Sequence, residues 1–151
     1  MVLVAAPPTF AVRAAQPSDS NAMASLAVQL GYECTELHVQ QRLRDMTDRE
    51  QYGVFVAVLA EAQVVGWVCV CVFRAIELDT FAEITGLVVD ETFRSRGTGK
   101  ALLHAAEEWA RRAECSAVAV HSNVTRNRAH QFYVRNGYEV IKTQKMFRKG
   151  L

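Results

Sequence analysis

Three apolar, β-rich segments in the middle of the chain constrain its fold more than any other feature. The first two, Gly53–Ala60 and Val64–Phe73, are separated by only three residues, which predicts an antiparallel hairpin. The third is Phe81–Val89, and a helical repeat of apolar residues follows it from about Gly97 to Arg112. A sheet that begins as a hairpin and continues through strand, helix and strand contains both antiparallel and parallel pairs.

The remaining expected elements flank this centre. Upstream, the sequence predicts a short strand and two helices, at Phe10–Arg13, between Ser20 and Gly31, and from Thr35 to about Asp48. Downstream, it predicts a strand, a helix closed by Gly137, and a last strand or hairpin, at Ser116–His121, Arg126–Asn136 and Tyr138–Phe147. The expected fold class is therefore α/β, with a mixed central sheet covered by helices on both faces. No linker or repeat interrupts the 151 residues, so we expect one domain over 1–151.

Composition excludes several classes of function. The formal net charge of +1 gives no basic surface for nucleic acid. The apolar run Val64–Phe73 is about half of the ~20 residues that a membrane span needs. The apolar start, residues 1–8, lacks the basic residues of a signal peptide, so we expect a soluble cytoplasmic protein. The spacing of the four cysteines matches no common zinc pattern, which favours free thiols in a reducing compartment over disulfides or metal.

A basic, glycine-containing turn joins the third apolar segment to its helix. It reads Arg94-Ser-Arg-Gly97-Thr-Gly99-Lys100. Consecutive amides at a helix start form an anion site, and glycine removes side chains that would block a phosphate. The positive charges of the turn add to this preference. The segment therefore predicts a phosphate-binding loop.

The turn matches neither common nucleotide motif. A P-loop requires Ser or Thr after Gly-Lys and a glycine where Arg94 stands, but Ala101 follows Lys100 here. The dinucleotide fingerprint requires a third glycine, and Leu102 occupies that position. A nucleotidase is disfavoured for the same reason.

The pattern Arg94-x-x-Gly97-x-Gly99 after Leu-Val-Val resembles the acetyl-CoA pyrophosphate loop of the GNAT acetyltransferases. A second block, from Ala129 to Tyr138, is similar to the A-x-x-F/L-Y-x-x-x-G-F/Y block of that superfamily. The resemblance implies a GNAT-like sheet that splays between Phe81–Val89 and Ser116–His121, with the co-substrate in the gap. It also implies an acetyl-CoA-dependent N-acetyltransferase that moves the acetyl group directly to a primary amine of a small molecule or peptide.

The resemblance also implies a set of co-substrate contacts. A first group should pair with pantetheine through the backbone: Leu87, Val88 and Val89. A second group should hold the pyrophosphate, through amides and positive charge: Arg94, Ser95, Arg96, Gly97, Thr98, Gly99 and Lys100. Many members carry Asn seven residues before the Tyr of the second block, where this chain has Arg126. Asn123 or Arg126 is therefore the expected side-chain contact to pantetheine.

Tyr133 and Glu83 are the candidate catalytic residues. By the resemblance Tyr133 lies near the thioester sulfur, where a phenol of reference pKa ~10 can protonate a departing thiolate. Its alternative is an amphipathic core tyrosine. Glu83 is a carboxylate inside an apolar strand, either a general base or an outward-facing or paired residue. His121, at the end of a strand, is the next candidate for the base.

The acceptor is expected between the N-terminal helices and the hairpin loops. The N-terminal half faintly resembles the aminoglycoside N-acetyltransferase branch, whose polycationic substrates need an acidic cavity. Six carboxylates offer one, or simply form a solvated surface: Glu33, Glu36, Asp45, Asp48, Glu77 and Asp79. The alternative function is a non-catalytic acyl-CoA-binding module. An edge strand at Thr143–Phe147 would invite pairing of two chains, so we expect a homodimer.

Overall fold

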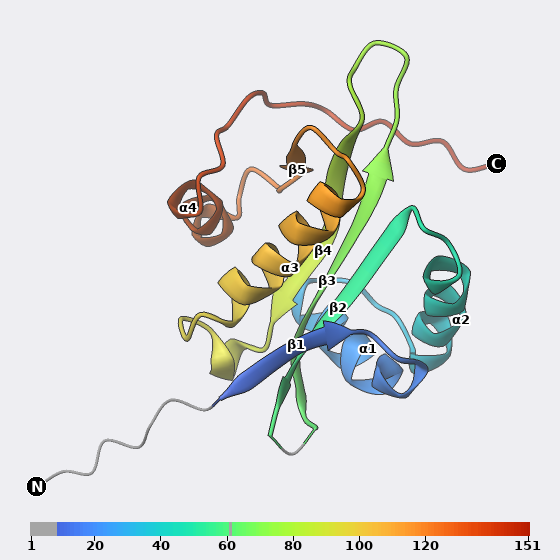
Figure 1. Ribbon diagram of the computed structural model, residues 1–151, viewed down its shortest axis with the longest axis vertical. Coiled ribbons are helices and arrows are strands. Elements are labelled where there is room, and N and C mark those ends of the chain that lie inside the picture. Colours follow the sequence, from blue (N-terminus) through green and yellow to red (C-terminus); the bar gives the residue numbers. More distant parts are fainter. Residues whose placement is uncertain (1–8, 61) are drawn as a thin grey trace, which may run out of the picture. The chain divides into compact units, whose positions relative to one another are not determined.

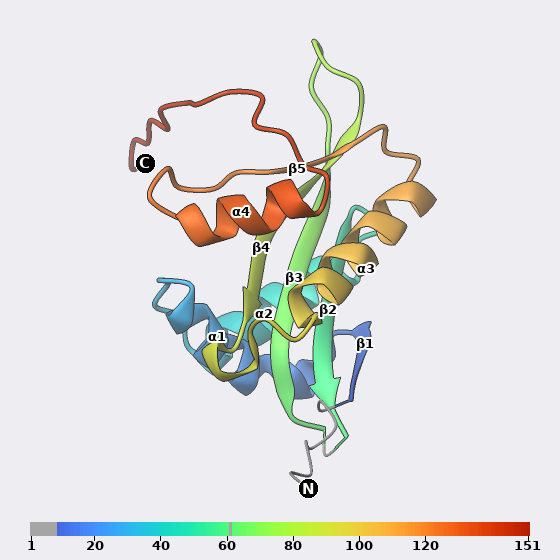
Figure 2. The same ribbon diagram turned by 90° about the vertical axis from the view of Figure 1, so that its left-hand side faces the viewer.

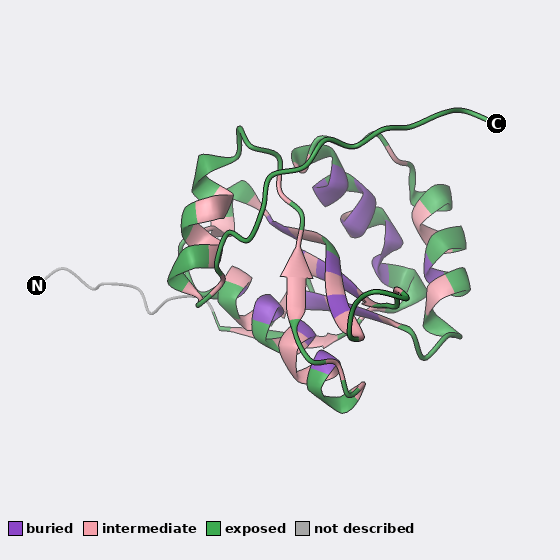
Figure 3. Cartoon of the chain, turned by 90° about the horizontal axis from the view of Figure 1, so that it is seen from above, coloured by how far each residue is buried: buried purple, intermediate pink, exposed green. Residues whose placement is uncertain are grey.

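The computed structural model describes residues 9–60 and 62–151. The apolar start that bears on targeting, residues 1–8, lies outside the described residues. The chain divides into two compact units, one ending at Val120 and the other comprising His121–Leu151. Every residue that is buried in the described chain belongs to the first unit. Buried residues are purple in Figure 3.

The first unit is built on a five-stranded sheet with the order β1-β2-β3-β4-β5. Its strands are β1 Phe10–Ala14, β2 Tyr52–Leu59, β3 Val64–Phe73, β4 Phe81–Val89 and β5 Val118–Val120. The first four strands pair antiparallel, and β4 pairs parallel with β5 across helix α3, Thr98–Arg112. The mixed sheet expected from the sequence is confirmed.

Helices cover both faces of this sheet (Figures 1 and 2). Helix α3 packs on β2, β3 and β4, and Leu102 and Ala106 of α3 are fully buried. The opposite face is covered by α1, Ser20–Gln29, and α2, Glu36–Thr47. There Met23 and Leu43 form a core with Val54, Val56 and Cys69. The alternation of side chains along the strands assigns each residue to one of these two cores.

Local chemistry fixes the ends of the N-terminal helices as the sequence predicts. The Thr35 hydroxyl accepts a hydrogen bond of 3.3 Å from the His38 amide and so caps α2. Gly31 follows α1 with a φ of +99°, the left-handed conformation that glycine adopts without strain. Among the described residues, no helix is both long enough and apolar enough to cross a bilayer.

An ion pair between a buried carboxylate and a partly exposed arginine holds the connection between β1 and α1. Asp19 is only 5% exposed, and both of its carboxylate oxygens accept hydrogen bonds from the Arg13 guanidinium, at 2.7 and 2.9 Å. The Gln16 amide donates to the same carboxylate at 2.7 Å. Hydrogen bonding from Arg13 holds the pKa of Asp19 below its usual range.

Replacing Asp19 with asparagine should destabilise the fold by about 1.5–3 kcal/mol at neutral pH, because charge-assisted bonds are lost at a buried position. A carboxylate with a lowered folded-state pKa stabilises the fold above its unfolded pKa of ~4. That contribution disappears as the pH falls through the lower, folded-state value. Urea denaturation at pH 7 and below pH 4 measures both effects. The exposed Asp45→Asn is the control, and an equally small change in both variants would contradict the prediction.

The second unit holds one helix, α4, which spans Asn127–Arg135 and ends before Gly137. The strand expected over Tyr138–Phe147 is wrong, because residues 138–151 form neither helix nor strand. The apolar side chains of this segment favour a pleated surface, but a strand also requires a hydrogen-bonded partner. The strand expected at Ser116–His121 is present in a shorter form as β5.

Candidate active site

The pairing of β4 with β5 stops part of the way along β4. Only Ala82, Glu83 and Ile84 have partners on β5. From Thr85 to Val89, no strand of the described chain pairs with β4 on this side. The edge of β4 at Leu87–Val89 is therefore open, and an extended molecule can add to it as a further strand, except at the Val89 carbonyl, which Arg94 contacts. This is the splay expected at this position.

A β-bulge interrupts the pairing of β4 with β3 just before this open edge. Cys69 is opposite Gly86 and Val70 is opposite Ile84, so Thr85 is the extra residue. Gly86 is required here, because a Cβ would come within 2.7 Å of the Trp67 ring. The Trp67 indole is itself held by a 3.1 Å bond to the Met23 carbonyl. The bulge supplies the strand irregularity that the sequence predicts near Gly86.

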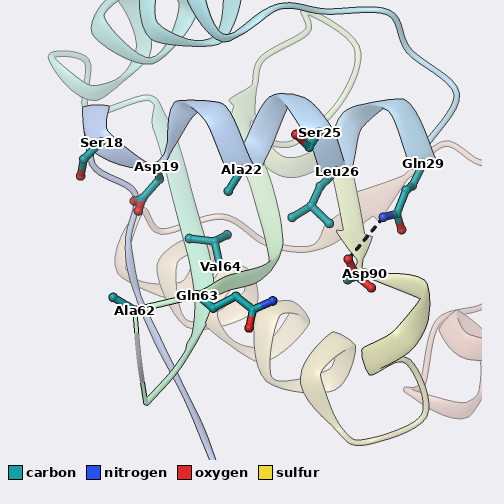
Figure 4. Close-up of a pocket in the computed structure, with 10 residues that line it drawn as sticks. All are labelled: Ser18, Asp19, Ala22, Ser25, Leu26, Gln29, Ala62, Gln63, Val64 and Asp90. Atoms are coloured by element: carbon teal, nitrogen blue, oxygen red, sulfur yellow. Dashed lines mark hydrogen bonds between the residues drawn. The ribbon is translucent and has the colours of Figure 1, made fainter.

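The loop after β4 is braced from its own start and from α1. The Asp90 carboxylate accepts bonds from the Thr92 amide at 2.9 Å and the Thr92 hydroxyl at 2.7 Å. These bonds lower the pKa of Asp90. Gln29 of α1 accepts from the Glu91 amide at 3.0 Å and donates to Asp90 at 3.3 Å, as Figure 4 shows for the second contact. Arg94 Nε donates to the Val89 carbonyl at 3.1 Å, which fixes the far side of the loop.

The loop then opens α3 with its amides available to an anion. Gly97 has a φ of +84° and precedes the helix, and the first intrahelical bond runs from the Ala101 amide to the Gly97 carbonyl. The amides of Thr98, Gly99 and Lys100 therefore have no acceptor within the helix. A Cβ on Gly97 would meet nothing within 4 Å, so the space in front of the turn is open. Positive charge comes from Arg96, 5.4 Å above the Phe93 ring, and from exposed Lys100.

Glu83 lies on β4 next to the bulge and is half-buried. Its partner on β3 is Cys71, and its partner on β5 is Ala119. Burial raises the pKa of Cys71 to about 11, and the negative charge of Glu83 adds to the increase. Cys71 is therefore a neutral thiol at physiological pH. The two side chains share the sheet face that α1 and α2 partly cover.

Tyr133 lies in the second unit, on α4. Its ring packs against Phe132 and Tyr138, with ring centroids 5.2 and 5.6 Å away. Burial raises the pKa of Tyr133, while the nearby charge of Arg126 lowers it. The phenol is therefore protonated at neutral pH and has a proton to donate.

The two candidate pantetheine contacts differ in their surroundings. The Asn123 side-chain oxygen accepts from the Thr125 amide at 3.1 Å and the Thr125 hydroxyl at 2.9 Å. Asn123 thus stabilises the turn before α4. Arg126 is exposed and directly precedes the helix, two turns before Tyr133. His130 Nε2 lies 3.0 Å from the Asn123 carbonyl and belongs to the same local arrangement.

Gln29, Trp67 and Cys71 contribute to this arrangement, and the sequence did not single them out. Each acts through a residue far away in the chain, so no local motif marks it. A hollow of about 350 Å³ lies between α1, the β2–β3 turn and Asp90 (Figure 4). It includes neither Glu83 nor Gly97, and two of its polar side chains, Gln29 and Asp90, brace the loop. No group of three metal-binding side chains occurs among residues 9–60 and 62–151.

Comparisons with known proteins agree with this geometry. Residues 21–138 match the model of the acetyltransferase (GNAT) family. The chain is 28% identical to an aminoglycoside N(6')-acetyltransferase type 1 from Stenotrophomonas maltophilia, over 99% of this chain and 97% of the relative. It is 35% identical to the uncharacterized N-acetyltransferase YhdJ of Bacillus subtilis, over 66% and 71% of the two chains. A GNAT family acetyltransferase from Staphylococcus aureus superimposes with a TM-score of 0.73 at 26% identity, covering 95% and 99%.

Proposed function

The chain belongs to the acetyltransferase (GNAT) family, and we propose that it transfers the acetyl group of acetyl-CoA directly to a primary amine of a small molecule. Its relatives named as N-acetyltransferases support its assignment as an acetyl-CoA-dependent N-acetyltransferase. One observation carries the proposal. The open edge of β4 leads straight into the amides at the start of α3, and a carboxylate stands on the same strand. The pantetheine arm of acetyl-CoA is extended and ends in a pyrophosphate. The arm matches the open strand edge, and the pyrophosphate matches the amides that follow it.

The residues fit acetyl-CoA as the co-substrate. We assign the backbone of Leu87–Val89 to pantetheine and the amides of Ser95–Lys100 to the pyrophosphate. The space in front of Gly97 supports the second assignment, because any side chain there would occupy the anion site. Arg126 is preferred over Asn123 for the side-chain contact, since Asn123 already accepts two hydrogen bonds. When bound, acetyl-CoA supplies the acetyl group as a thioester.

The protein must supply two proton transfers. Glu83 accepts a proton from the ammonium form of the acceptor, which frees the nitrogen lone pair for attack. Tyr133 returns a proton to the sulfur that leaves. We assign the oxyanion contact to a backbone amide near Leu87, because β5 pairs only with Ala82, Glu83 and Ile84 and leaves that edge of β4 open. The acid and the base are thus separate groups.

A single assay tests the function. The protein is mixed with acetyl-CoA and a panel of primary amines, and the free thiol is followed over time. Release of thiol that depends on an amine supports the enzyme. Binding of acetyl-CoA with no turnover of any amine would instead favour a non-catalytic acyl-CoA-binding module.

Glu83→Gln should keep the size of the side chain and remove the base. The remaining rate then depends on the amine that is already deprotonated, so it should rise with pH toward the amine's own pKa. Wild type should reach its plateau at lower pH. Initial rates across the pH range measure this, with the exposed Glu50→Gln as control. A variant that matches wild type at every pH would make Glu83 a structural residue and His121 the next candidate.

We also propose that the chain forms a homodimer in a reducing, cytoplasmic compartment. The support now comes from exposed apolar side chains rather than from a strand: Val140, Ile141, Met146 and Phe147 are 80–90% exposed. Covering them with a second copy would remove apolar surface from water. The mass measured by sedimentation at micromolar concentration should be that of two chains, and a mass of one chain would rule this out.

A further inference from the structure

The sheet face that carries Glu83 continues into a set of aromatic side chains. Tyr52 of β2 is opposite Cys71 of β3, and Cys71 is opposite Glu83 of β4. Residues directly opposite each other in antiparallel strands point to the same face. One step further along β3 and β4, Phe73 is opposite Phe81, with ring centroids 4.8 Å apart. We call Tyr52, Cys71, Phe73 and Phe81 the aromatic floor.

The helices that cover this face stop before they reach the aromatic floor. Val54, Val56 and Cys69 lie on the same face and are buried against Met23 and Leu43. The next residues outward are only partly covered: Tyr52, Cys71 and Phe81 are half-buried, and Phe73 is 39% exposed. The apolar surface beside Glu83 is therefore accessible to a small molecule.

Among the strand side chains the charge is equally simple, because Arg74, Glu77 and Asp79 lie on the exposed loop that joins β3 to β4. Glu83 is the one carboxylate among the five side chains, and Cys71 beside it is a neutral thiol. A single carboxylate next to two packed aromatic rings complements one ammonium group attached to an apolar body. A polycation would instead need several carboxylates spread over the surface that it contacts.

We infer that the acceptor is an arylalkylamine-like molecule, with one ammonium group at Glu83 and an apolar ring on the aromatic floor. The inference rests on the proposed acetyl transfer. The ammonium first gives one proton to Glu83, which releases it to solvent. The nitrogen–carbon bond then forms as the carbon–sulfur bond breaks, and the second proton lost by the nitrogen balances the proton gained by the thiolate. Burial of the ring gives affinity, and Glu83 selects the position of the nitrogen.

The first experiment uses the wild-type protein with saturating acetyl-CoA. Thiol release is measured with 2-phenylethylamine, n-propylamine, spermidine and neamine. Burying a phenyl ring should raise kcat/KM for 2-phenylethylamine over n-propylamine by about 10- to 100-fold. A polycation that exceeds 2-phenylethylamine, or equal values for the two monoamines, would overturn the inference and leave the enzyme function intact. Thiol release with none of the amines would overturn both.

The second experiment tests the floor itself. Phe73→Ala should reduce the preference for 2-phenylethylamine over n-propylamine to about 3-fold or less, because the ring contact is lost. Phe81→Ala is the second variant, and melting curves show that each variant is folded. Ile76 is fully exposed on the β3–β4 loop, so Ile76→Ala is the matched control and should keep the wild-type preference. Folded Phe73 and Phe81 variants that both keep the preference would overturn the inference.

Discussion

Replacing Gly97 with valine is expected to abolish the stabilisation of the protein by CoA. At a concentration one hundred times its Kd, a ligand that binds only the folded state adds about 2.7 kcal/mol, or roughly 5–10 °C in Tm for a chain of this size. Wild type should show this shift with CoA or acetyl-CoA and none with ATP or NAD. Valine would place a branched Cβ where the pyrophosphate is expected, so the variant should show no shift with any of them.

Backbone strain must be separated from the loss of the binding site. Gly97 has a φ of +84°, so valine also strains the folded state by about 1–3 kcal/mol. Gly137 offers a matched control, with a φ of +88° and likewise nothing within 4 Å of a Cβ. Gly137→Val should lower the Tm of the ligand-free protein to a similar degree and keep a shift with CoA. Equal stabilisation of wild type and Gly97→Val would exclude the loop as the pyrophosphate site.

Periodicity was sufficient to predict the main strands and α-helices of the first unit. Thr35 and Gly31 mark helix boundaries through local chemistry that operates over a few residues. The loop that we propose as the pyrophosphate site could be singled out for the same reason, since its amides, glycines and charges are consecutive. The open edge of β4 followed from the family resemblance, and the pairing of β5 with Ala82–Ile84 alone confirms it.

Long-range contacts set the limit of such predictions. Gln29 braces a loop 61 residues away, and Trp67 excludes a side chain from Gly86 on another strand. Cys71 lies opposite Glu83 because the bulge at Thr85 shifts the register between β3 and β4. No local sequence pattern specifies that shift. The expected strand at Tyr138–Phe147 failed because composition reports what a side chain prefers and not whether a partner strand is present.

Tyr133→Phe is expected to preserve CoA affinity and to lower kcat by about 10²-fold, if protonation of the thiolate limits the rate. The ring is retained, so the packing against Phe132 and Tyr138 at 5.2 and 5.6 Å is retained as well. Only the phenolic proton is lost. CoA affinity from thermal shifts and kcat from thiol release measure the two quantities separately.

The neighbouring phenol provides the control for this prediction. Tyr138→Phe removes a hydroxyl from the same aromatic cluster, so it should leave kcat close to wild type. Burial raises the pKa of Tyr133, which keeps the phenol protonated but makes it a weaker acid. The charge of Arg126 lowers this pKa and so makes the phenol a stronger acid. Arg126→Gln should therefore lower kcat in wild type and have less effect on kcat in Tyr133→Phe, where no phenol remains to be tuned. Normal turnover by Tyr133→Phe would mean that the thiolate departs unaided, and a loss of CoA affinity at unchanged kcat would make the tyrosine a binding residue only.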